Sequence, residues 1–365
     1  MTPRIVAHCR AGFEPEAAAD LQRVAALAGS TIEVDAPDRR GFVVVTPQPF
    51  EAERWVRAFR QAPPIFVRAL FLGSGPHPLF EGGRAGSRPD RVTPLAALIE
   101  AFRAESPLGK FLATSELRLE TADTNEGKEL SGLCRAIERP LAERLNVTDL
   151  AATPSTSALH VLFVDGAHVY VGASRKPWGS PWPMGIPRLR MPAGAPSRSV
   201  LKLAEAFVTF LADRERAFVQ AGMRAIDLGA APGGWTWLLA QRGLRVTAVD
   251  NGPLKGEIAH DPLVTHLRVD GLTYEPRRPV DWLVCDIVEQ PSRIAGLVAR
   301  WMSEGYAARA IFNLKLPMRK RYDEVRRCEA ILGDSLSRAR ADYTLALRHL
   351  YHDREEITGF VERLK

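Results

Sequence analysis

The chain has 365 residues, of which 46% are hydrophobic and 25% are charged, and its formal net charge is +6. This composition is typical of a soluble globular protein and excludes a chain too polar to fold, and no apolar run is long enough to cross a bilayer. The length predicts two or three domains, and the positive charge favours a polyanionic partner.

The amino terminus, "MTPRIVAHCRAGFEP", has neither a long apolar stretch nor a small-residue cleavage site, which argues against a signal peptide. The four cysteines form no C-x-x-C pair, which argues against a zinc site and against a disulfide framework. These features predict a cytoplasmic protein that holds no metal.

The first half of the chain predicts two α+β regions. In residues 1–60 the strand-like segments "RIVAHCR" and "TIEVDAPDRRGFVVVTP" flank the helix-like "EPEAAADLQRVAALAG". Residues 61–173 combine the helix-like "TPLAALIEAFRAE" and "ELSGLCRAIERPLAERL" with the strand-like "SELRLETAD" and "SALHVLFVDGAHVYVGAS". Within the last segment, "VDGAHV" predicts a tight turn between two strands.

Residues 174–196 are rich in Pro, Gly and Trp, which predicts a linker or an ordered cover over another part of the protein. Trp178 and Trp182 are suited to stack on bases or to pack on a neighbouring domain, and packing is the commoner role.

Two basic clusters follow. One contains six basic residues and no acidic one: Arg175, Lys176, Arg188, Arg190, Arg198 and Lys202. The other contains Lys315, Arg319, Lys320 and Arg321. A charge run is usually a solvated face, so these clusters indicate nucleic-acid binding only if they border a catalytic pocket.

From Ser197 onward, strands and helices alternate. We expect helices at residues 200–212, 234–242, 292–303 and 322–339. We expect strands at residues 223–228, 244–250, 264–269, 281–286 and 308–314, followed by a terminal strand pair. This alternation predicts a doubly wound, Rossmann-like α/β fold with a mostly parallel sheet covered on both faces.

Polar residues stand at the carboxyl ends of these expected strands: Asp227, Asp250, Asp270, Asp286 and Lys315. Ligands of open α/β sheets bind beyond this edge of the sheet, near the point where the strand order reverses. A sheet with a purely structural role has less reason to repeat the pattern. The sequence therefore predicts a ligand pocket at this edge.

The turn "DLGAAPGGW" has neither the P-loop spacing nor the G-x-G-x-x-G spacing of dinucleotide sites. Gly229, Gly233 and Gly234 let a ligand approach the backbone. Asp250 lies 21 residues after Gly229, close to the offset at which a carboxylate binds a ribose diol. A site that binds a ribose diol but has no pyrophosphate-binding loop predicts S-adenosylmethionine as the ligand. Asp270 is suited to accept a hydrogen bond from the adenine amino group of this ligand. Any one of these aspartates is also suited to cap a helix.

With "SRSVLKLAEAF", "VCDIVEQP", "IFNLKLPMRKRY" and "LYHDREEITGFV", the turn resembles the motifs of the FtsJ-like ribose 2′-O-methyltransferases, and of their RlmM type over nearly the whole length. The RlmM type methylates a cytidine ribose in 23S rRNA. The resemblance implies a ferredoxin-like unit at 1–60, a THUMP RNA-binding domain at 61–173, a linker at 174–196 and a methyltransferase domain at 197–365. It implies 23S rRNA or a precursor particle as partner, with no DNA and no membrane.

The resemblance also implies a catalytic tetrad of two lysines and two carboxylates: Lys202, Asp286, Lys315 and Glu356. We expect Lys315 to accept the proton of the 2′-hydroxyl, because burial and the charge of Lys202 lower the pKa of a lysine. Asp286 and Glu356 oppose that shift. Glu355 remains an alternative to Glu356, and a simple pair of Lys202 with Glu205 remains an alternative to a catalytic Lys202.

For the cofactor, the resemblance implies a set of contacts from the glycine turn and the strand ends: Ser197, Ala231, Pro232, Gly233, Gly234, Asp250, Asp270 and Asp286. Ser199 remains an alternative to Ser197. The sequence has no N-P-P-Y or D-P-P-Y motif of amino-group methylation and no Pro-Cys nucleophile after the fourth strand, so Cys285 is expected to pack. The rival interpretations are a non-catalytic RNA-binding assembly factor and a nicotinamide-dependent oxidoreductase.

Overall fold

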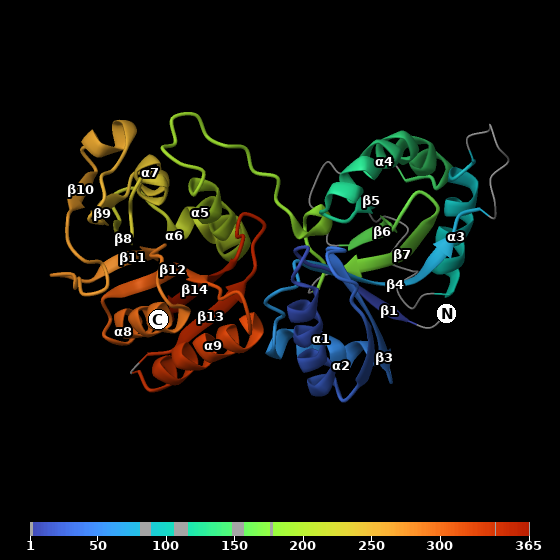
Figure 1. Ribbon diagram of the computed structural model, residues 1–365, viewed down its shortest axis with the longest axis horizontal. Coiled ribbons are helices and arrows are strands. Elements are labelled where there is room, and N and C mark those ends of the chain that lie inside the picture. Colours follow the sequence, from blue (N-terminus) through green and yellow to red (C-terminus); the bar gives the residue numbers. More distant parts are fainter. Residues whose placement is uncertain are drawn as a thin grey trace. The chain divides into compact units, whose positions relative to one another are not determined.

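The computed structural model describes residues 3–80, 89–105, 116–147, 157–175, 178–339 and 341–364. The chain divides into two compact units, Met1–Ile186 and Pro187–Lys365. Each unit is built on a sheet of seven described strands with helices packed beside it (Figure 1). Among the described helices, none combines the length and the apolar character that a membrane span requires.

In the amino-terminal unit the strands lie in the order β2-β3-β1-β4-β7-β6-β5. The described elements are β1 (Arg4–His8), α1 (Glu14–Ala28), β2 (Thr31–Asp35), β3 (Phe42–Gln48), α2 (Ala52–Gln61), β4 (Ala69–Pro78), α3 (Val92–Glu105), β5 (Glu116–Thr121), α4 (Asn125–Arg144), β6 (Ser157–Phe163) and β7 (His168–Arg175). Strand β1 pairs with both β3 and β4, so one sheet continues across residue 60, and the division of this unit into two domains stays a prediction.

Two details of this unit differ from the sequence analysis. The segment after α1 forms two antiparallel strands, β2 and β3, because Arg39 and Gly41 both adopt positive φ angles that end an extended run. Helix α2 and strand β4 were not predicted. The helix is amphipathic and buries Trp55, Ala58 and Phe59 at helical spacing, a short signal inside an otherwise charged segment.

The described part of the Pro-rich segment before the unit boundary, residues 178–186, packs on the amino-terminal unit. The guanidinium of Arg118 donates to the carbonyl oxygens of Ser180, at 2.9 Å, and of Pro181, at 3.2 Å. Trp178 meets Phe59 edge to face, with ring centroids 6.3 Å apart. This contact confirms the prediction that Trp178 packs on another part of the protein.

In the carboxyl-terminal unit the strand order is β10-β9-β8-β11-β12-β14-β13, and the first five strands are parallel. Its main elements are α5 (Val200–Ala206), α6 (Glu215–Phe218), β8 (Arg224–Leu228), α7 (Gly234–Gln241), β9 (Arg245–Val249), β10 (Val264–Leu267), β11 (Val280–Cys285), α8 (Pro291–Ser303), β12 (Ala307–Lys315), α9 (Arg321–Ser337), β13 (Tyr343–Arg348) and β14 (Glu356–Arg363). The predicted doubly wound α/β fold is confirmed.

The strand order of this sheet reverses between β8 and β11, which are parallel neighbours. The chain leaves β8 toward β9 and β10 on one side, and it continues from β11 to β12 on the other. The carboxyl ends of β8 and β11 therefore flank the position where ligands bind in such folds. The glycine turn follows β8, and Asp286 follows β11.

The helix predicted at residues 200–212 is only partly α-helical. Helix α5 ends at Ala206, and the chain continues as a π-helical turn over Phe207–Leu211. This wider turn places Phe207 and Leu211 in the core. There the ring of Phe207 packs against that of Trp282, with the ring centroids 5.8 Å apart. The other predicted helices and strands of this unit are confirmed within one or two residues at each end.

Candidate active site

Four charged side chains meet at the carboxyl edge of the parallel strands, and we call them the lysine–carboxylate ring: Lys202, Asp286, Lys315 and Glu356. The ammonium group of Lys315 contacts the carboxylates of both Asp286 and Glu356. The ammonium group of Lys202 contacts Glu356 and lies 3.4 Å from Oδ2 of Asp286. Opposite charges therefore alternate around the ring.

The fold explains why these four residues meet. Asp286 directly follows β11, and Lys315 ends the neighbouring strand β12. Antiparallel pairing of β12 with β14 sets Lys315 directly opposite Glu356, which begins β14. Lys202 reaches the same place from helix α5. Three strands and one helix thus contribute one side chain each.

The structure distinguishes Glu356 from its alternative Glu355, and it shows whether Lys202 simply pairs with Glu205. Glu355 lies outside the ring, where its exposed carboxylate accepts a hydrogen bond from Arg321 at 3.3 Å. Glu205 is buried and accepts from the backbone amides of Tyr351 and His352, so it is not simply a surface partner of Lys202. The ring therefore contains Lys202 and Glu356 and leaves Glu355 outside.

The ring is partly open to solvent. The exposed fractions are 18% for the Lys202 side chain, 17% for Asp286 and 22% for Lys315. Burial alone lowers the pKa of Lys315, but the carboxylates of Asp286 and Glu356 raise it by more, so its pKa lies above the ordinary value. The expectation of a lowered pKa is therefore wrong for the protein without ligands, because each ammonium group of the ring contacts two carboxylates.

The glycine turn between β8 and α7 brings backbone close to other groups. Gly233 has φ +112°, a conformation that L residues rarely adopt. A Cβ at Gly234 would collide with the hydroxyls of Ser197 and Ser199, which lie 2.5 Å from each other. Both serines therefore adjoin the turn. The two oxygens of Asp250 accept from two backbone amides, that of Ala231 in the turn at 2.9 Å and that of Gly252 at 2.7 Å.

This arrangement fits S-adenosylmethionine. Asp250 is held at the turn by its two amide donors, and each carboxylate oxygen has further capacity to accept from a ribose diol. Asp270 is exposed and receives the amide of Leu272 at 2.9 Å, which leaves its carboxylate facing solvent. Pro232 follows Ala231 in the turn and precedes Gly233. Asp286 belongs to the ring as well as to the implied cofactor contacts.

Two other polar groups at the strand ends are buried. Asp227 is 1% exposed and accepts from the hydroxyl of Thr236 at 2.6 Å, and burial raises its pKa to about 7. Burial also raises the pKa of the Cys285 thiol to about 12, so this cysteine is no nucleophile at neutral pH. The expectation that Cys285 packs is confirmed, because its side chain lies in the core.

Three buried polar residues beside the ring were not predicted from the sequence: Asn313, Asp353 and Thr358. The amide of Asn313 donates to Oδ1 of Asp286 at 3.1 Å. A signal for Asn313 was present, since it is a polar residue inside the apolar strand "AIFNLKL" and stands two positions before Lys315, on the same face. Asp353 and Thr358 had no comparable signal.

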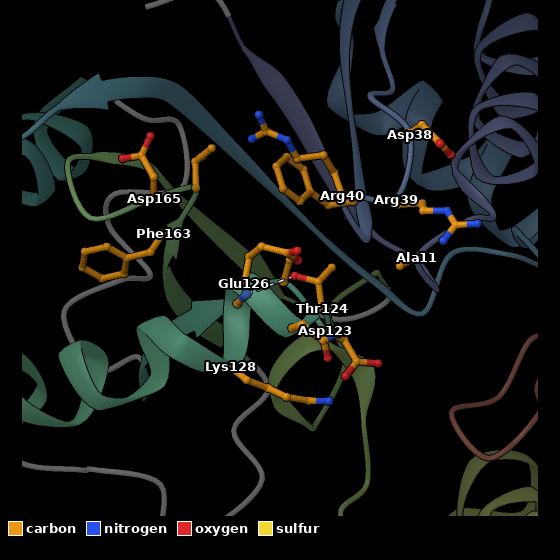
Figure 2. A pocket seen from close by; sticks show the side chains of 15 residues that line it. Ala11, Asp38, Arg39, Arg40, Asp123, Thr124, Glu126, Lys128, Phe163 and Asp165 are labelled. Atoms are coloured by element: carbon orange, nitrogen blue, oxygen red, sulfur yellow. Dashed lines mark hydrogen bonds between the residues drawn. The ribbon is translucent and has the colours of Figure 1, made fainter.

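The amino-terminal unit contains a separate cavity of about 670 Å³ at the start of α4 (Figure 2). Three exposed basic side chains line it: Arg39, Arg40 and Lys128. Four carboxylates line it as well: Asp38, Asp123, Glu126 and Asp165. Because charges of both signs surround it, the cavity does not by itself select an anionic ligand.

Models of known protein families match segments of both units. Three family models match: the RlmM ferredoxin-like domain at residues 1–71, the N-terminal part of ribosomal RNA large subunit methyltransferase M at residues 90–175, and the FtsJ-like methyltransferase at residues 195–315. Among solved structures, TrmN from Thermus thermophilus is 18% identical over 99% of this chain and 100% of that chain, with a TM-score of 0.36.

Curated relatives match over nearly the whole length. Ribosomal RNA large subunit methyltransferase M of Azoarcus sp. is 44% identical over 98% of this chain and 95% of its own. The protein of that name from Methylococcus capsulatus is 45% identical over 98% of this chain and 97% of its own. The chain therefore belongs to the ribosomal RNA large subunit methyltransferase M family, whose members are S-adenosylmethionine-dependent methyltransferases with an FtsJ-like domain.

Proposed function

We propose that this protein methylates the 2′-hydroxyl of a cytidine in 23S rRNA, with Lys315 as the proton acceptor. The observation that carries this proposal is the lysine–carboxylate ring, which lies at the carboxyl edge of the sheet and is partly open to solvent. A hydroxyl needs only orientation and loss of its proton to accept a methyl group from a strong electrophile, and the ring offers groups for both.

S-adenosylmethionine supplies an electrophilic methyl group on a sulfonium centre. We propose that the backbone of Ala231, Pro232, Gly233 and Gly234 holds it, with Asp250 on its ribose and Asp270 on its adenine. Ser197 and Ser199 both adjoin Gly234, which supports a role for either hydroxyl at the methionine end. Asp286 then faces both the cofactor and the target.

The raised pKa of Lys315 means that its amine must lose a proton before it accepts one. Its contacts with Asp286 and Glu356 provide the route, because transfer of the proton to either carboxylate converts an ion pair into a neutral pair. Exclusion of water by bound RNA favours the neutral pair, since charges cost more in a less polar medium. The neutral Nζ then takes the hydroxyl proton as the ribose oxygen gains the methyl group.

Ribosomal RNA as the substrate is supported by charge near the ring. Arg319 and Lys320 are exposed and follow Lys315 closely, in the connection to α9. The second basic cluster therefore borders the ring, the condition under which it favours nucleic acid. We propose that the amino-terminal unit, as a ferredoxin-like region and a THUMP domain, also contacts rRNA, in the cytoplasm.

The test is methyl transfer in vitro. Purified protein, tritiated S-adenosylmethionine and rRNA from a strain lacking this protein are combined, and the product nucleosides are identified by mass spectrometry. We expect 2′-O-methylcytidine at one position of 23S rRNA. The absence of transfer to naked or particle-bound rRNA would contradict the proposal, and a failure to bind S-adenosylmethionine as well would favour the RNA-binding assembly factor. A methyl group on a base would retain the enzyme class and reject the hydroxyl chemistry.

A further inference from the structure

A second cross-strand pair lies directly behind the lysine–carboxylate ring. Asn313 on β12 stands opposite Thr358 on β14, two residues along from the pair of Lys315 and Glu356. Residues two apart on a strand share a face, so both pairs point toward the same side of the sheet. The side chains of Asn313 and Thr358 are fully buried, and the hydroxyl of Thr358 lies 2.9 Å from Oδ1 of Asn313.

The buried Asp353 extends this pair. Its Oδ1 lies 3.0 Å and its Oδ2 2.8 Å from the hydroxyl of Thr358, and Oδ2 also accepts from the backbone amide of Leu350 at 3.0 Å. The hydroxyl of Thr358 therefore has three oxygens within 3.0 Å but only one hydrogen to donate. If Asp353 were ionised, the single hydroxyl hydrogen of Thr358 could not lie both toward Asp353 and toward Asn313, so one of these close oxygen–oxygen contacts would have no hydrogen between its atoms.

A neutral Asp353 resolves this conflict. Its carboxyl hydrogen is donated to Thr358, and the hydroxyl of Thr358 is then free to donate to Asn313. Burial raises the pKa of Asp353 well above its usual range, and the charges of Glu356 and Glu205 raise it further, which agrees with a neutral group. The direction of each hydrogen bond in the chain follows from this single proton.

We propose that Asn313 is a positioning residue for methyl transfer, held by a directed chain of hydrogen bonds from Asp353 through Thr358 to its amide oxygen. Because that oxygen is occupied by Thr358, the NH₂ group of Asn313 faces Oδ1 of Asp286 at 3.1 Å. A flipped amide would set an oxygen against the carboxylate. The chain thus fixes the carboxylate of Asp286 in the orientation that faces both lysines. This inference rests on the proposed function for its kinetic effect.

The first experiment compares variants of Thr358 and Asp353 in the methyl-transfer assay. In Thr358→Val the chain is broken, and we expect kcat to fall at least tenfold while KM for S-adenosylmethionine stays within twofold. Thr358→Ser keeps the hydroxyl and should stay within threefold of wild type. Asp353→Asn also stays within threefold, because an amide donates to Thr358 as the neutral carboxyl does. A kcat within twofold for Thr358→Val, or an Asp353→Asn as weak as Thr358→Val, would overturn the inference.

A control for the packing of β14 is Ile357→Val, which removes one methylene from the neighbouring buried position and leaves the chain intact. It should retain kcat. If Thr358→Val does not fold, Asn313→Asp is tested in its place. The new carboxylate at position 313 would lie beside that of Asp286, and the two carboxylates together would hold a proton more tightly than Asp286 with Asn313. The acid limb of the kcat profile then moves to higher pH by about one unit; an unmoved limb counts against the inference.

A second measurement needs no activity, so it separates this inference from the proposed function. The ¹³C carboxyl resonance of Asp353, assigned by its absence from Asp353→Asn, should be that of a neutral carboxyl at pH 7 in the ligand-free protein. A carboxylate resonance would overturn the direction of the chain even if wild-type protein methylates rRNA. A neutral carboxyl in a protein that transfers no methyl group would support the chain and reject the function.

Discussion

The amino-terminal unit contains a closed cluster of buried polar side chains, whereas the lysine–carboxylate ring of the carboxyl-terminal unit is partly open to solvent. In the amino-terminal unit, the Glu120 cluster consists of His8, Glu120, His160 and Ser174. His160 Nδ1 lies 2.8 Å from Glu120 Oε2, and its Nε2 lies 2.8 Å from the hydroxyl of Ser174. The backbone amide of Met184 donates to Glu120 Oε1 at 2.7 Å. The side chains of Glu120 and His160 are only 1% and 4% exposed.

The groups of the lysine–carboxylate ring are in equally close contact, but the ring is partly accessible to solvent, since the Lys315 side chain is 22% exposed. A closed cluster whose groups bind each other and the backbone leaves no place for a substrate, and it ties the segment at Met184 to strand β5. An open ring of alternating charge has groups that a ligand is able to reach. Exposure to solvent, rather than the number of buried charges, therefore distinguishes the candidate chemical site of this protein from its structural cluster.

Loss of a ring lysine should give the largest effect on activity and a small one on stability. In Lys315→Ala we expect methyl transfer to fall by about 10³-fold, the typical contribution of a proton acceptor. Cofactor affinity, measured by calorimetry, should hold within a few fold. Lys255→Ala, at an exposed lysine outside the ring, serves as the control. Near-normal transfer by Lys315→Ala would reject its proposed role.

Loss of the Glu120 charge should lower stability strongly and change cofactor binding little. Burial raises the pKa of Glu120, but His160 and His8 lower it by more, so it lies well below the ordinary value of 4.5. A lowered carboxyl pKa stabilises the folded state above pH 4.5, and this contribution is lost as the pH falls through the folded-state pKa. At pH 7, Glu120→Gln should lower the free energy of unfolding of this unit by about 3 kcal/mol.

The matching readouts are urea denaturation at several pH values and calorimetry with S-adenosylmethionine. Cofactor binding should not change in Glu120→Gln, and the loss of stability on acidification should be smaller than in wild type. If the variant lost cofactor affinity but kept its stability, the contrast between a structural cluster and a chemical ring would fail.

The smallest expected effect concerns the rim of the ring. Arg319→Glu and Lys320→Glu should each raise KM for rRNA about tenfold at moderate salt, with kcat within twofold, because phosphate contacts add affinity without joining the reaction. The slope of log affinity against log salt should fall by about one for each lost contact. Arg338→Glu, near the end of α9, is the control. An unchanged salt slope would place the RNA elsewhere.

The candidate site was partly readable from local sequence. Apolar runs that end in Asp227, Asp250, Asp286 and Lys315 predict strands, and parallel strands bring their carboxyl ends to one edge. That argument alone groups Asp286 with Lys315. Lys202 and Glu356 were predicted as site residues only from the resemblance. A lysine on a helix and the first residue of a late strand have no local sequence pattern that indicates a pocket.

Local sequence patterns were enough to predict the alternation of strands and helices, the doubly wound sheet and the residues at its edge, because hydrophobic period and turn residues are local properties. Three features required the folded structure: the raised pKa of Lys315, the pairing of Asn313 with Thr358, and the separation of β2 from β3. A pKa is set by the sum of burial and neighbouring charges, and a cross-strand partner is set by register. Both depend on residues distant in the chain, which no local pattern encodes.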